Sequence, residues 1–178
     1  MSTTVVNQLT SKLFLQRVLV IAFVISLYSC SEKKSETETP AGTIKIDLKK
    51  YGKPFSIFVP DTGRSPLTIQ ELSTGGLEIR SGKNFGLLIQ DQFTDLNQVR
   101  GDLKEDDVNK LKSIMTDEPE LLVWESEITQ PEFHFYLNKK IKNSEYSFED
   151  LKSTELEPFG KNAILEMVER CKSAGVEN

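Results

Sequence analysis

This chain of 178 residues has no excess of basic side chains, a single histidine and only one strongly apolar run. It contains 22 Lys and Arg against 27 Asp and Glu, and every acidic residue lies beyond Cys30. From Cys30 onward, 20 basic side chains face 27 acidic ones, a net charge of −7. A nucleic-acid-binding protein needs a basic surface that displaces counterions from phosphates. Nucleic acid is therefore not an expected partner.

Motifs of catalysis and cofactor binding are also lacking. One histidine cannot supply a zinc site built on two or three imidazoles, and no Gly-x-Ser-x-Gly motif is present. In "GLEIRSGKN", five residues separate Gly76 from Gly82, and Asn84 stands where a phosphate-binding loop needs a hydroxyl. A hairpin turn explains this segment better. The sequence predicts no metal, no cofactor and no enzymatic activity.

The apolar run is short and lies near the N-terminus. "VLVIAFVISL", residues 18–27, follows Lys12 and Arg17, the order of charged and apolar segments in a secretory signal peptide. A helix from Val18 to Cys30 would be roughly 20 Å long, whereas the apolar core of a bilayer is roughly 30 Å thick. We therefore expect a signal peptide over residues 1–29 and no permanent membrane span.

The end of this run, "LYSC", resembles the lipobox of bacterial lipoproteins. Leu27 and Ser29 fit the pattern, while Tyr28 stands where a small or β-branched residue is usual. The resemblance implies that Cys30 becomes the first mature residue and carries a diacylglycerol thioether and an acyl chain. Two or more such chains anchor a protein stably in a membrane. Ser31 then implies the outer membrane of the cell envelope, with the domain facing either the periplasm or the outside.

A polar linker and a folded domain follow. Residues 31–42 are too polar to bury much surface, so we expect a flexible tether there. Residues 43–178 are expected to form one globular domain. Its first half alternates apolar and polar residues between Gly- and Asn-containing turns, which predicts antiparallel strands. These strands are expected over residues 43–48, 54–60, 67–72, 76–81 and 85–90.

Two helices are predicted. Over residues 102–115 the positions of Val108, Leu111, Ile114 and Met115 match one helical face, with Asp102 as a capping residue. A C-terminal helix is predicted over residues 161–174.

Cys171 shares the apolar face of the C-terminal helix with Ile164 and Val168, so we expect it to be buried as a small hydrophobe. With Cys30 lipidated, no disulfide is expected.

Between the helices, a second meander is predicted. A turn over residues 129–132 would place Ser126 opposite Phe135 and Trp124 opposite Leu137. A turn at residues 143–144 would pair Ile141 with Tyr146. This register gathers the aromatic side chains on one side of the ribbon.

The resulting fold class is α+β, an antiparallel sheet of about eight strands packed by two helices. This layout, with its early "PFSIFVP" strand, loosely resembles the PsbP-like fold.

Three functional hypotheses follow. The first is a lipid-anchored, non-catalytic domain that binds an unknown envelope protein or stabilises an envelope assembly. The second is a carrier of a small apolar ligand, in a cavity near Phe85, Trp124 and Phe135. The third is an enzyme whose site lies on a polar patch opposite the aromatic core. This patch is predicted to contain His134 opposite Glu127, and Tyr136 opposite Glu125.

Overall fold

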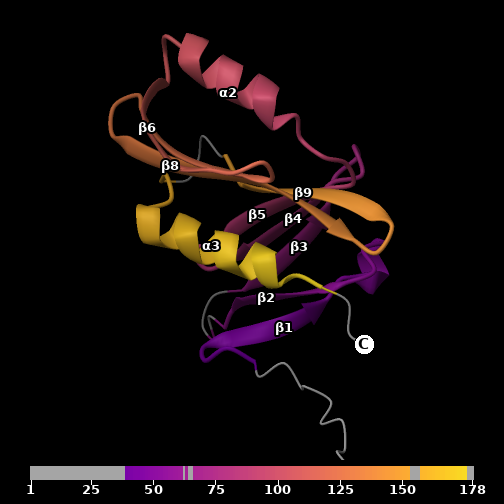
Figure 1. Cartoon of the computed structure of the whole chain (residues 1–178). Coiled ribbons are helices and arrows are strands. Elements are labelled where there is room, and N and C mark those ends of the chain that lie inside the picture. Colours follow the sequence, from indigo (N-terminus) through magenta and orange to yellow (C-terminus); the bar gives the residue numbers. More distant parts are fainter. Residues whose placement is uncertain (1–38, 62, 64–65, 153–156, 176–178) are drawn as a thin grey trace, which may run out of the picture. The chain divides into compact units, whose positions relative to one another are not determined.

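The computed structural model describes residues 39–61, 63, 66–152 and 157–175 (Figure 1). The predicted signal peptide and Cys30 lie outside the described residues. The α+β class is confirmed, with two helices packed on antiparallel strands. The described elements are β1 (Thr43–Asp47), η1 (Lys49–Tyr51), β2 (Ser56–Pro60), β3 (Leu67–Glu71), β4 (Leu77–Ser81), β5 (Gly86–Gln90), α2 (Leu96–Glu105), β6 (Lys110–Asp117), β7 (Leu121–Glu127), β8 (Pro131–Ile141), β9 (Ser144–Asp150) and α3 (Lys161–Ser173).

The strands form two antiparallel sheets. Seven of them follow the order β3-β4-β5-β9-β8-β7-β6, so two meanders meet where β5 pairs with β9. The remaining two, β1 and β2, form a separate hairpin. The sheet expected to have about eight strands is therefore a sheet of seven accompanied by a sheet of two.

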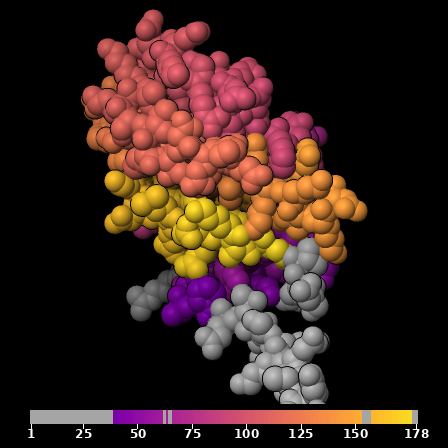
Figure 2. Space-filling view, viewed as in Figure 1, coloured from indigo at the N-terminus to yellow at the C-terminus, as the bar shows by residue number. Residues whose placement is uncertain are grey.

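The larger core lies on one face of the seven-stranded sheet, here called the α3 face, which presents Phe135, Leu137 and Phe148. α3 contacts β8 and β9 on one side and β2 on the other, so it packs between them (Figure 1). The two sheets also meet directly where Ser81 Oγ of β4 donates to the Pro60 carbonyl of β2 at 2.8 Å. In the space-filling view its outer surface forms a yellow band beside the indigo β1–β2 region (Figure 2). Cys171 lies in this core as a free, fully buried thiol, as predicted. Burial raises the pKa of its thiol.

The opposite face of the sheet, here called the α2 face, presents Leu122, Trp124 and Tyr136 at its β6–β8 end. α2 covers this end with Leu96, and half-buried side chains complete a second, smaller apolar cluster. These partly buried members are Val99, Leu103, Leu111, Ile114 and Tyr136. Both faces of the β6–β8 end are therefore buried.

The prediction of a helix over residues 102–115 is wrong, because α2 ends at Glu105 and Lys110 begins β6. β6 has register shifts between Leu111 and Ser113 and between Ile114 and Thr116. The first bulge turns Leu111 and Ile114 to the same face, although they are three residues apart. That spacing imitates a helical period. Met115 instead packs against the larger core.

The predicted register of the second meander is also wrong. Phe135 pairs with Val123 rather than with Ser126, a shift of three residues. A shift by an odd number of residues changes which β7 side chains share a face with Phe135. Trp124 therefore lies on the α2 face, away from Phe135.

At the next turn, Ile141 pairs with Ser144 rather than with Tyr146. The turn residues are therefore Lys142, which has a φ of 56°, and Asn143. This even shift leaves Ile141 and Tyr146 on the α3 face.

Candidate functional site

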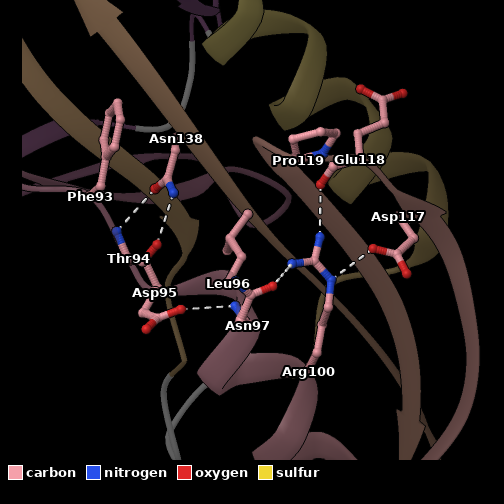
Figure 3. Close-up of a pocket in the computed structure, with 10 residues that line it drawn as sticks. All are labelled: Phe93, Thr94, Asp95, Leu96, Asn97, Arg100, Asp117, Glu118, Pro119 and Asn138. Carbon is pink, nitrogen blue, oxygen red and sulfur yellow. Dashed lines mark hydrogen bonds and ion pairs between the residues drawn. The ribbon is translucent and has the colours of Figure 1, made fainter.

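A pocket of about 620 Å³ opens at the N-terminal end of α2, where the helix meets the loop between β6 and β7 (Figure 3). One wall comes from the segment that leads into α2, and the other comes from the β6–β7 turn. The side chains used in the argument below are Phe93, Asp95, Arg100, Asp117, Glu118 and Asn138.

The first wall is fixed by Asn138, a buried side chain on β8. Its Nδ2 donates to the carbonyl oxygen of Thr94 at 2.8 Å, and its Oδ1 accepts from the Thr94 N–H at 3.0 Å. Asp95 then begins the helix, because its Oδ1 accepts from the N–H groups of Asn97 and Gln98. This is an N-cap in its usual form, and it satisfies donors that would otherwise attract an anion.

The second wall is held by Arg100, which reaches from α2 to the end of β6 (Figure 3). Its Nε donates to Asp117 Oδ1 at 2.7 Å, and its Nη2 donates to the Glu118 carbonyl at 2.8 Å. Its Nη1 donates to Asn97 Oδ1 at 3.2 Å. All three guanidinium nitrogens are thus engaged within the protein.

These bonds leave carboxylate oxygens free to accept hydrogen bonds in the pocket lining. Among the residues that the structure describes, the carboxylates of Asp95 and Asp117 each use only Oδ1 in a hydrogen bond, and the Glu118 side chain uses neither oxygen. Asp117 alone bonds to the guanidinium through its carboxylate, while Asp95 caps α2 and the Glu118 carboxylate points away from Arg100 (Figure 3). Phe93, with 37% of its surface exposed, adds an aromatic wall. The arrangement suits a ligand group that brings positive charge, N–H donors and some apolar surface.

The predicted site residue His134 lies on the α2 face but is buried, with 8% of its surface exposed. Its Nδ1 lies 2.8 Å from Asp150 Oδ2, and its Nε2 lies 3.6 Å from Glu132 Oε2. Asp150 Oδ1 also accepts from the N–H of Phe135 at 2.9 Å. The imidazole is therefore enclosed between two carboxylates, and the expected partner Glu127 is not among its neighbours.

Tyr136 lies beside His134, and both rings pack against Trp124. The Trp124 ring centroid is 5.6 Å from that of Tyr136 and 5.3 Å from that of His134. Lys152 Nζ lies over both Trp124 and Tyr136, at 5.7 Å and 5.2 Å from their centroids. Burial, followed by the charge of Glu149, raises the pKa of Tyr136. The rings therefore form a packed cluster capped by a lysine.

Glu125 and Glu127, the other two predicted patch residues, lie on the α3 face. Glu125 pairs with Phe133 and accepts from Ser113 Oγ at 3.3 Å, and Glu127 forms an ion pair with Lys112 at 2.9 Å. The structure therefore brings His134 and Tyr136 together and separates them from both glutamates.

The side chains expected to line an apolar cavity are also separated. Phe85 and Phe135 belong to the larger core, and Trp124 belongs to the smaller cluster. None of the three lines the pocket beside α2.

The pocket was not anticipated from the sequence. Asp95 directly before Leu96 is a recognisable helix-start signal. The other contacts carry no local signal, because Arg100 and Asp117 are 17 residues apart and Thr94 and Asn138 are 44 apart.

Comparisons with known proteins add no identity. The chain matches no protein-family profile, no curated protein and no solved structure. Across the described ranges, no group of three or more His, Cys, Asp or Glu residues is placed to hold a metal ion. None of the described helices is long and apolar enough to cross a membrane.

Proposed function

We propose that this chain is a lipid-anchored, non-catalytic domain of the bacterial envelope. It binds a protein partner, and the pocket beside α2 receives a basic side chain of that partner. The anchor rests on the resemblance of "LYSC" to a lipobox and on the polar segment 31–42 that follows Cys30.

The observation that carries the binding role is the set of unused carboxylate oxygens in a prearranged pocket. Asn138 and Arg100 hold the two walls through bonds that already exist in the free protein. A partner lysine or arginine would meet the Asp117 carboxylate, which Arg100 already holds through Oδ1, with the charges of Asp95 and Glu118 nearby in the pocket lining. Preorganisation of this kind improves affinity because less ordering remains to be done on binding.

The burial of His134 supports a non-catalytic role. A general base must reach the proton that it abstracts from a substrate. Here Nδ1 faces Asp150 and Nε2 faces Glu132, and the ring is packed against Trp124. This constellation stabilises the sheet rather than presenting a base to solvent.

Site-specific photo-crosslinking in native membranes tests the binding role. A photoreactive phenylalanine analogue at position 93 should form an adduct of reproducible mass. The same analogue at position 165, on α3, should not, although Phe93 and Leu165 are equally exposed, at 37% and 39%. The adduct should weaken with added salt and in Glu118→Gln, but not in Glu120→Gln, because Glu120 does not line the pocket.

Two results would contradict the proposal. Equal adducts at positions 93 and 165 would show that the pocket has no special role. Equal yields in the two glutamine variants would show that the pocket's charge does not recruit the partner. The anchor is tested separately by the mass of the purified chain, which should begin at lipidated Cys30 and should lose the lipid in Cys30→Ser.

A further inference from the structure

The two edges of the seven-stranded sheet differ in how well they are protected from strand pairing. β6, at one edge, contains two register shifts and two lysines, Lys110 and Lys112. Bulges and edge lysines both discourage another strand from pairing there. β3, at the other edge, pairs with β4 in unbroken register and contains no lysine or proline after its start at Leu67.

The hydrogen bonds next to β3 show which of its backbone groups point outward. The Leu72 N–H donates to the Gly76 carbonyl, so the pair at positions 72 and 76 is hydrogen-bonded. Bonded pairs alternate along an antiparallel ladder, so Gln70 and Thr68 also bond toward β4. The N–H and C=O groups of Leu67, Ile69 and Glu71 therefore face away from β4. Within the part of the chain that the structure describes, no hydrogen bond reaches them.

This pattern is symmetric about Ile69. We propose that β3 pairs with β3 of a second copy of this chain, antiparallel and centred on Ile69. Ile69 then lies opposite Ile69 of the other copy, and Leu67 lies opposite Glu71. Each of these pairs joins two outward-facing residues, so each exchanges two hydrogen bonds. The two sheets become one continuous sheet across the dimer.

Side chains agree with this register. Leu67 and Ile69 are only half-buried against the core. The Ile69 side chains of the two copies would therefore bury more apolar surface by packing against each other at the centre of the contact. Glu71 is the only charged residue in β3. Its two copies lie at opposite ends of the paired segment, roughly 13 Å apart at about 3.3 Å per residue. That separation exceeds the Debye length of about 8 Å at physiological salt, so their repulsion is largely screened.

The contact is short, because β3 has five residues. A short edge contact buries less surface than a typical stable interface, so the dimer is expected to be weak and to depend on concentration.

Paired cysteine variants test the register directly. In the proposed dimer, Thr68 of one copy lies opposite Gln70 of the other. Oxidising an equimolar mixture of full-length Thr68→Cys and Gln70→Cys chains should give at least fivefold more disulfide-linked dimer than either variant alone. Cys30 and Cys171 are present in all three samples, so their background cancels.

A backbone variant tests the hydrogen bonds. Glu71→Pro, introduced into both cysteine variants, removes one outward N–H without touching the ladder to β4 and should return cross-linking to background. Glu71→Ala removes the same carboxylate but keeps the N–H, and it should preserve cross-linking.

Three results would overturn the proposal. The first is a mixture that cross-links no better than its components. The second is an unaltered yield in Glu71→Pro. The third is a wild-type chain that remains monomeric in detergent solution by sedimentation at every concentration.

Discussion

The two helices of this domain are stabilised in different ways. α3 buries Ile164, Met167, Val168 and Cys171 between the two sheets, yet no side chain caps its N-terminus. α2 buries only Leu96, but the Asp95 carboxylate caps its first turn, and Arg100 ties it to the β6–β7 turn. α3 thus depends on tertiary packing, whereas α2 combines a smaller apolar contact, through Leu96 and the half-buried Val99 and Leu103, with the polar bonds of Asp95 and Arg100.

This difference has consequences for motion and function. Segments with little buried apolar surface open locally at lower free energy than the core does. The pocket is built on α2, so we expect it to be more easily remodelled than the region around α3. Each of the following predictions tests this contrast, from the largest expected effect to the smallest.

Met167→Ala should cause the largest loss of stability. The Met167 side chain is fully buried in α3, and truncations of this kind cost about 2–5 kcal/mol in free energy of unfolding. Denaturant unfolding followed by the fluorescence of Trp124, the only tryptophan, measures this loss. Glu166→Ala, one position away and half exposed, should change stability by less than about 0.5 kcal/mol. A cost below about 1 kcal/mol for Met167→Ala would show that α3 is not held by burial.

Asp95→Ala should cost about 1 kcal/mol, because it leaves the N–H groups of Asn97 and Gln98 without their acceptor. The effect should be local to α2. Hydrogen exchange should accelerate over residues 96–105 and change little over residues 161–173. Asp95→Asn, which can also cap a helix, should stay close to wild type. Equal acceleration in both helices would contradict the separate stability of α2.

Gly101→Ala should stabilise α2 by about 0.5–1 kcal/mol. Glycine inside a helix loses more backbone freedom on folding than alanine does, and no atom lies within 4 Å of the added Cβ. Hydrogen exchange in α2 should therefore slow by roughly threefold. Unchanged or faster exchange would mean that the helix propensity of residue 101 does not set the local stability of α2.

The contrast between the helices also explains how far the sequence could predict the structure. α3 was predicted to within one residue, and its face of Ile164, Val168 and Cys171 is confirmed, because apolar periodicity records burial directly. α2 was missed because its apolar face is short: only Leu96, Val99 and Leu103 follow the i, i+3, i+7 helical spacing, and the last two are half-buried. The i, i+3 spacing of Leu111 and Ile114 then suggested a helix where a bulged strand lies.

The candidate site was harder to predict than the fold. His134 was expected opposite Glu127, and a register shift of three residues placed it opposite Trp124 instead. Register depends on which residues form the turn, and a short turn without glycine, such as residues 128–130, leaves several alternatives. The pocket depends on contacts such as Arg100–Asp117 that form only after the whole sheet is assembled.

Gly160→Ser should have the smallest effect, a gain of a few tenths of a kcal/mol. Gly160 caps α3 with φ −70° and ψ 158°, an extended conformation that serine adopts easily, and the space around it is open. The serine oxygen would accept a hydrogen bond from the first turn, whereas Gly160→Ala would not and serves as the control. Denaturant unfolding measures both variants, and equal stability of the two would show that no cap forms. The gain is small because water already solvates these N–H groups beside glycine, so the added cap replaces an existing hydrogen bond.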